Sequence, residues 1–253
     1  MSAPPPAAPG GAPAPVVMGI DVAARRPCVA VALQAGRGAR VVGWMEADHR
    51  HRGETARLLE WVEALSPAVV AIDAPQAPNR HLLKGSRLRV CDWELRRRGL
   101  PLYQVPARGQ PTPEWIAVGF EYFRLLKHRG FEMAATTNLP LAFGGAPALL
   151  EAYPYAAFAC LLREQRADAA PGATPPKKST RAGTRMRIDL LRAARVEWDD
   201  YYDHDSLDAL AAGATAWRYL LGTASAVGDQ REGLLWLPAT ADFLRERVAP
   251  RRT

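Results

Sequence analysis

The sequence predicts an α/β domain whose mixed β-sheet is flanked by helices. Two observations predict this fold class. The first part of the chain has a β-β-β-α-β pattern of apolar segments, and later segments continue the mixture of strands and helices. In addition, 48% of the 253 residues are hydrophobic, which is enough for one sizeable core.

The opening elements are separated by turn-forming residues. In chain order we predict strands at 16–20, 27–34 and 40–46, a helix at 54–65 and a strand at 68–72. The sequence AGRG at 35–38 has the composition of a hairpin turn, and Ser66-Pro67 ends the helix. The first and fourth strands are continuous apolar runs, which is typical of strands buried on both faces of a parallel sheet.

Chain connectivity then limits the topology. Hairpins place the first three strands side by side and antiparallel, and a right-handed crossover through the helix returns the fourth strand parallel to the first. The order is therefore 3-2-1-4, the beginning of an RNase H-like sheet.

The rest of the chain completes this sheet. Residues 79–145 form a mostly helical insertion, with a basic segment at 86–98 and an amphipathic helix at 113–129. The next strand, at 148–150, is the fifth and extends the order to 3-2-1-4-5. Later elements are helices at 155–166, 183–194 and 205–221 and a final strand at 232–237.

Composition sets the expected domain boundaries. Residues 1–15 are rich in Ala, Pro and Gly and predict a disordered tail. Residues 16–240 form one domain with a mobile loop at about 167–182, and 241–253 are a basic tail. Because we find neither a signal peptide nor a membrane-spanning run, we expect a soluble, cytoplasmic protein without a membrane partner.

The cysteine spacing and the net charge limit the kinds of site and partner that we expect. Cys28, Cys91 and Cys160 are far apart and form no CxxC pair, so we interpret them as buried thiols rather than disulfides or a zinc site. The net charge is +7, and only four of the 33 basic residues are lysines. An Arg-rich positive field favours polyanions such as nucleic acid, although codon composition explains the same excess equally well.

Three apolar segments end in the same way, on a carboxylate: Asp21, Asp73 and Glu151. Ligands of open α/β sheets bind outside the carboxyl ends of parallel strands, so these side chains should meet at one edge. Negative charges so close together are unfavourable unless a cation compensates them. Oxygen ligands select hard ions, which indicates Mg²⁺ or Mn²⁺.

Asp205 and Asp208 add a fourth contribution. They are three residues apart at a helix start and therefore share one helix face. An alternative is that Asp205 caps the helix, with Asp208 completing a capping box. Asp21 and Asp73, taken singly, are also compatible with turn-forming roles. It is the convergence of all these positions in one fold that favours a metal site.

The ordered motifs also resemble a known family. They are Gly19-Ile20-Asp21, Ile72-Asp73-Ala74-Pro75, Arg89-Val90-Cys91-Asp92, Glu151-Ala152-Tyr153-Pro154 and Asp205-Ser206-Leu207-Asp208-Ala209-Leu210, followed by 228–238. Together they span about 17–238 and are similar to the domain of unknown function 429 family. This resemblance implies an RNase H-like fold and a predicted nuclease whose acidic pattern is similar to that of Holliday-junction resolvases.

The implied reaction is metal-assisted hydrolysis of a phosphodiester bond, with two ions about 3.5–4 Å apart. We expect Asp21 to bridge the ions because its strand is central, and Asp73 and Asp208 to complete them. Asp205 and Glu151 are expected to be auxiliary ligands or to support the ligands.

Basic residues are candidates for holding nucleic acid. The candidates are Lys177, Lys178 and Arg181 in the loop, Arg185 and Arg187 in the next helix, and Arg87 and Arg89 in the insertion. For each one, a solvated surface charge is the alternative. Trp93, Trp115 and Tyr103 are candidates for base stacking, with core packing as the alternative.

Two other functions compete with the nuclease. Actin-like and sugar-kinase-like phosphotransferases also begin with a strand ending in GID, but Val22-Ala23-Ala24 offers no phosphate-binding turn after it. A non-catalytic nucleic-acid-binding protein on the same fold is the other alternative, although five retained carboxylates argue against it. The sequence does not distinguish DNA from RNA and gives no oligomeric state.

Overall fold

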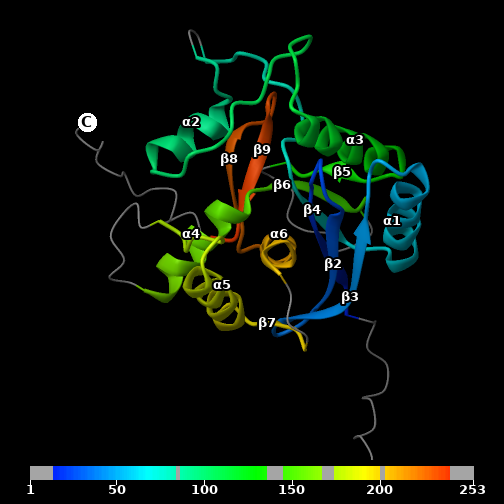
Figure 1. The fold of residues 1–253 in the computed structure, drawn as a ribbon, viewed down its shortest axis with the longest axis vertical. Coiled ribbons are helices and arrows are strands. Elements are labelled where there is room, and N and C mark those ends of the chain that lie inside the picture. Colours follow the sequence, from blue (N-terminus) through cyan, green and yellow to red (C-terminus); the bar gives the residue numbers. More distant parts are fainter. Residues whose placement is uncertain (1–13, 84–85, 136–144, 167–173, 200–202, 240–253) are drawn as a thin grey trace, which may run out of the picture.

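The computed structural model describes residues 14–83, 86–135, 145–166, 174–199 and 203–239 (Figure 1). The predicted tail at 1–15, except for its last two residues, lies outside this part, as does the predicted basic tail at 241–253. Of the predicted mobile loop, only 174–182 is described.

The elements follow the expected order, with three additional short strands. The strands are β1 (Val16–Asp21), β2 (Cys28–Ala35), β3 (Ala39–Ala47), β4 (Val69–Asp73), β5 (Glu132–Met133), β6 (Ala148–Ala152), β7 (Val196–Glu197), β8 (Ser225–Asp229) and β9 (Gly233–Leu237). The helices are α1 (Arg52–Leu65), α2 (Val90–Arg97), α3 (Glu114–His128), α4 (Pro154–Gln165), α5 (Arg181–Ala193) and α6 (His204–Leu220). Strands β5, β7 and β8 were not predicted.

The sheet confirms the predicted order 3-2-1-4-5, in which β6 is the predicted fifth strand. Along the sheet the strands run β7-β3-β2-β1-β4-β6-β9-β8, and β5 pairs with β6. Strand β2 is antiparallel to β1, whereas β4 and then β6 are parallel to it. The predicted final strand, β9, pairs parallel to β6. This is the mixed, RNase H-like sheet that the opening pattern predicts.

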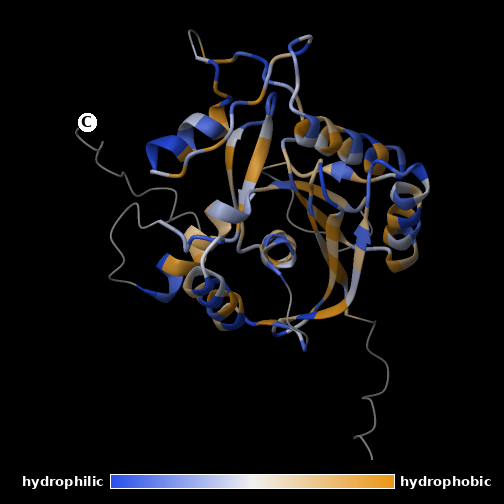
Figure 2. Ribbon diagram, in the orientation of Figure 1, coloured by the Kyte–Doolittle hydropathy of each residue, from blue (hydrophilic) through white to orange (hydrophobic). Residues whose placement is uncertain are grey.

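Helices cover both faces of the sheet (Figures 1 and 2). Alternate residues of β1 point to opposite faces, so Val17 packs in one core with α4, α5 and α6. Met18 and Ile20 pack in a second core against α1 and α3. Helix α2 belongs to the insertion and packs beside β8 and β9 in a third cluster. Among its described residues the insertion contains the helices α2 and α3, the short strand β5, and irregular segments before α2 and between the two helices.

Helix α6 lies unusually close to the central strand. A Cβ atom on Gly19 would come within 2.1 Å of the Ala209 carbonyl oxygen and 2.3 Å of the Gly213 amide nitrogen. Glycine at position 19 therefore allows direct contact between β1 and α6, which brings the start of α6 to the end of β1. No helix within the described ranges is long and apolar enough to span a membrane.

Candidate active site

The carboxylates of Asp21 and Asp73 lie side by side at the end of two parallel strands. Residues 21 and 73 are register partners in the β1–β4 ladder. Both follow the alternation of Val17 and Val69, so they are on the sheet face that α6 covers. The predicted adjacency of these two aspartates is present in the structure.

Helix α6 contributes Asp205 and Asp208 to the same region. The cap of this helix is Asp203, whose Oδ1 accepts hydrogen bonds from the backbone N–H groups of Asp205 (3.1 Å) and Ser206 (2.9 Å). The alternative in which Asp205 is the cap is therefore wrong. Because the cap lies two residues before Asp205, neither Asp205 nor Asp208 is needed to cap the helix. Both side chains are buried.

Burial and crowding make the ionisation of Asp21 and Asp73 unfavourable. Burial, followed by the negative charge of Asp208, raises the pKa of Asp21 to about 7. Burial and the charges of Asp21 and Asp208 raise the pKa of Asp73 well above its usual value. The side chain of Asp73 makes no hydrogen bond or ion pair with any residue that the structure describes. The two strand-end carboxyls thus lack full charge compensation from the protein.

Three basic residues supply part of that compensation. Arg26, from the loop between β1 and β2, donates a hydrogen bond to Asp21 Oδ2 at 3.1 Å and forms an ion pair with Asp205. Lys178 Nζ lies 2.8 Å from one oxygen of Asp208, and Arg187 Nη1 lies 2.7 Å from the other. Arg26 was not among the sequence candidates, and it is the residue that connects the β1 and α6 carboxylates.

Glu151 is held separately from the four aspartates. In the β4–β6 ladder it is the partner of Ile72, so it follows the alternation that faces α1 and α3. Arg89 binds both of its oxygens, at 2.6 and 2.9 Å, and the backbone N–H of Gln76 donates a hydrogen bond to Oε2 at 2.9 Å. Glu151 reaches the common cavity, but its oxygens are already bound by these donors.

Arg89, a sequence candidate for holding nucleic acid, is buried and does not have that role. Its side chain is 1% exposed and also pairs with Asp92, so it fixes the insertion to the sheet and is not a surface contact for phosphate. Glu232, which was not among the sequence candidates, supports the segment that carries Arg89. Its carboxylate accepts backbone hydrogen bonds from Arg80, Leu82 and Val90.

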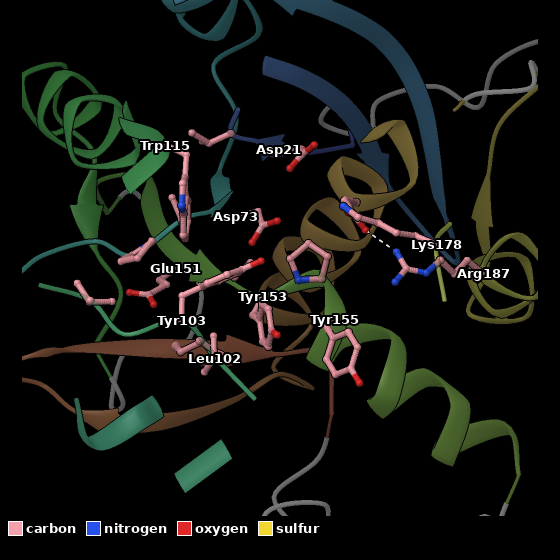
Figure 3. Close-up of a pocket in the computed structure, with 18 of the residues that line it drawn as sticks. Asp21, Asp73, Leu102, Tyr103, Trp115, Glu151, Tyr153, Tyr155, Lys178 and Arg187 are labelled. Carbon is pink, nitrogen blue, oxygen red and sulfur yellow. Dashed lines mark hydrogen bonds and ion pairs between the residues drawn. The ribbon is translucent and has the colours of Figure 1, made fainter. Parts of the chain in front are cut away.

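These groups surround one cavity of about 500 Å³ (Figure 3). Asp21, Asp73, Glu151 and Asp208 line it, together with Arg26, Lys177, Lys178 and Arg187 and the aromatic residues Tyr103, Trp115, Tyr153 and Tyr155. Asp205 contacts Arg26 but is not among the lining residues. In Figure 3, Trp115 and Tyr103 lie on one side of the aspartates, and Lys178 and Arg187 lie on the other.

The other basic candidates are outside the cavity. Arg87, Arg181 and Arg185 are exposed, and none of them lines it. Arg185 lies 3.4 Å from Asp189 one helical turn away. Trp93 is also outside, with the Arg97 guanidinium over its ring. The structure thus brings Lys177, Lys178 and Arg187 to the acidic cluster and leaves these other residues apart from it.

The donor set suits a hard divalent cation. Two strand-end carboxyls lie in register, one of them without a protein partner, and Asp208 is close enough to raise the pKa of both. Carboxylate oxygens are the ligands that Mg²⁺ and Mn²⁺ prefer. Within the described residues, no group of three possible ligands is already drawn together at metal-binding distance. The basic side chains of Lys178 and Arg187 bind Asp208 instead.

Comparison with known families covers most of the chain. The family model described as "Protein of unknown function (DUF429)" matches residues 19–232. The chain belongs to the DUF429 family. All the carboxylates of the candidate site fall inside the matched region of this DUF429 protein, as do Arg26, Lys178 and Arg187. The resemblance suggested by the ordered motifs is therefore confirmed.

Other comparisons add little about function. Among solved structures, one similar chain is Thermus thermophilus RuvC, described as "T. thermophilus RuvC in complex with Holliday junction substrate". The two chains are 14% identical, the match covers 83% of this chain and 97% of the RuvC chain, and the TM-score is 0.39. At this level of similarity we draw no conclusion about activity. Comparison with curated proteins gives no significant match.

Proposed function

We propose that this DUF429 protein is a metal-dependent nuclease that hydrolyses phosphodiester bonds in nucleic acid. The observation that carries the proposal is the register pairing of Asp21 with Asp73 at adjacent strand ends, with Asp208 facing them from α6. Protein cations compensate these carboxylates only in part. A divalent cation bound there would relieve the remaining repulsion.

The proposal gives each carboxylate a role. Asp21, Asp73 and Asp208 would together hold the Mg²⁺ or Mn²⁺ ions, with Asp21 at the centre of the set because its strand is central. Bound ions of this kind supply a water nucleophile at neutral pH and neutralise charge on the phosphate. Asp205 orients Arg26, and Glu151 orients Arg89, so these two act as auxiliary groups.

Basic residues around the cavity would bind the phosphate. Lys178 is the strongest candidate, because its side chain is 45% exposed while its ammonium group lies at the acidic cluster. Arg187 is buried, and its Nε donates a hydrogen bond to the Pro176 carbonyl oxygen, so it holds the loop that carries Lys177 and Lys178. Arg181, Arg185 and Arg87, all exposed, are proposed to contact nucleic acid farther from the scissile bond.

Cleavage of labelled nucleic acids tests the proposal. Purified protein is incubated with single-stranded, duplex, hybrid and branched substrates in Mg²⁺, in Mn²⁺ and in EDTA. We expect cleavage of at least one substrate that requires the divalent ion. Asp21→Asn and Asp73→Asn should each reduce the rate by at least a hundredfold, since each removes a metal ligand. Asp199→Asn, at a side chain that is 87% exposed, is the matched control and should cleave like the wild type.

Two outcomes would contradict the nuclease. One is the absence of cleavage with every substrate and ion, and the other is equal activity in the Asp21→Asn variant. ATP turnover without cleavage would instead favour the actin-like or sugar-kinase-like alternative. Metal-independent binding of nucleic acid without cleavage would favour the non-catalytic alternative.

A further inference from the structure

An aromatic pair forms one wall of the cavity that contains Asp21 and Asp73. The rings of Tyr103 and Trp115 meet edge to face, with centroids 5.2 Å apart and planes 64° apart. Tyr103 comes from the segment between α2 and α3, and Trp115 is in the first turn of α3. Both line the cavity, on the side opposite Lys178 (Figure 3).

Core packing does not explain the position of Tyr103. Its side chain is 67% exposed, so burial contributes little to holding it there. The chain around it is nevertheless fixed, because the hydroxyl of Tyr153 donates a hydrogen bond to the Pro101 carbonyl oxygen at 2.5 Å. Tyr153 itself lines the cavity, as does Leu102. An accessible aromatic face is therefore held beside the acidic cluster.

The combination of groups indicates the kind of ligand that fits. A cavity of about 500 Å³ with apolar and aromatic walls is the size of a site for a small organic group. An aromatic face attracts a planar ring by stacking. At the other side, Lys178, whose side chain is 45% exposed, offers positive charge to an anion. A planar base joined to a phosphate has both features, and the base is free to stack here only when it is unpaired.

We propose that Tyr103 and Trp115 stack one unpaired nucleobase of the substrate strand next to the phosphate at the acidic cluster. The substrate class is then nucleic acid with unpaired nucleotides, either a single strand or an unpaired position within a duplex. The place of the phosphate rests on the proposed nuclease function. Stacking of the base is a binding property, so it is measured without cleavage.

Fluorescence anisotropy with end-labelled oligonucleotides tests the proposal in EDTA, and again in Ca²⁺. The probes are single-stranded DNA and RNA of one sequence, the paired duplex, the duplex with a bulged nucleotide, and a DNA strand of abasic sites. We expect the single strands and the bulge to bind at least tenfold more tightly than the duplex and the abasic strand. The DNA and RNA probes then show which nucleic acid is preferred.

Variants separate stacking from charge. Tyr103→Ala should weaken binding of the single strand by about five- to a hundredfold, the usual contribution of one stacked base. It should leave binding of the abasic strand unchanged. Tyr103→Phe keeps the ring and should bind like the wild type. Trp93→Ala is the matched control, because Trp93 is a 40% exposed aromatic residue outside the cavity.

Trp115→Phe provides a second variant at the same wall, and because it retains a ring it should weaken binding less than Tyr103→Ala. Equal affinity for the duplex, the abasic strand and the single strand would overturn the proposal. So would an unchanged affinity in Tyr103→Ala, or no binding in either buffer. If stacking is present and no substrate is cleaved, the inference stands while the nuclease fails. If a substrate is cleaved and Tyr103→Ala binds the single strand like the wild type, the nuclease stands while the inference fails.

Discussion

Asp21→Asn should stabilise the metal-free protein at pH 8, although it removes an ion pair. Asp21 is 3% exposed, and burial with the charge of Asp208 raises its pKa from 3.8 to about 7. One pKa unit corresponds to about 1.4 kcal/mol, so a charged Asp21 costs the fold up to about 4 kcal/mol above pH 7. The asparagine removes this cost and still accepts a hydrogen bond from the half-exposed Arg26. We expect a net gain in the free energy of unfolding of about 1–3 kcal/mol.

The sign of the pH dependence follows from the raised pKa. An unfolded chain releases the proton of Asp21 near pH 4, whereas the folded protein holds it up to about pH 7. The neutral form therefore stabilises the wild type at low pH, and this contribution is lost as the pH rises from 4 to 7. The advantage of Asp21→Asn should accordingly be largest at pH 8 and should shrink toward pH 4.

Urea unfolding in EDTA at pH 5 and pH 8, followed by circular dichroism, measures this difference. Asp199→Asn is the control, because its exposed side chain should change stability by less than about 0.5 kcal/mol. A variant that is less stable than the wild type at pH 8 would show that the charged Asp21 does not destabilise the fold. A gain of equal size at both pH values would show that the effect does not come from ionisation.

Three further predictions concern residues that support the site or line its cavity. Gly19→Ala should destabilise the protein by about 3 kcal/mol or more in urea unfolding, because the new methyl group overlaps α6; an unchanged midpoint would exclude that close approach. Arg89→Met should cost about 3–5 kcal/mol in the same measurement, since it leaves Glu151 buried and unpaired; a neutral effect would show that water reaches this pair. Lys178→Ala should reduce cleavage at least tenfold with a melting temperature within a few degrees of the wild type. Full activity would remove Lys178 from the phosphate site.

The sequence predicted the central sheet because its strands carry strong local signals. Buried apolar runs that end on Asp21 and Asp73, with a helix between them, leave few ways to connect the chain. The edge strands had no such signal. Strands β5 and β7 have two residues each, too short for any periodicity. Strand β8 has the sequence SAVGD, without apolar alternation.

The site was predicted in part for a similar reason. The ends of β1 and β4 put Asp21 and Asp73 at one edge of the sheet, as predicted. The side to which Glu151 points depends on the register between β4 and β6, which places it on the opposite face. Local sequence patterns do not determine this register. Asp203 lies just before α6 and Asp205 is the second residue of this helix. The sequence alone therefore did not show that Asp203 is the cap. Arg26 is in a loop without periodicity, and only the folded chain brings it to Asp205.

Calorimetric titration with Mn²⁺ at pH 8 measures whether Asp21 and Asp73 hold a divalent ion. We expect Mn²⁺ to bind the wild type saturably and to bind Asp21→Asn and Asp73→Asn at least tenfold more weakly. Asp199→Asn should bind Mn²⁺ like the wild type. Absence of binding to the wild type at millimolar Mn²⁺, or an unchanged affinity in Asp73→Asn, would show that these two aspartates do not hold a divalent ion.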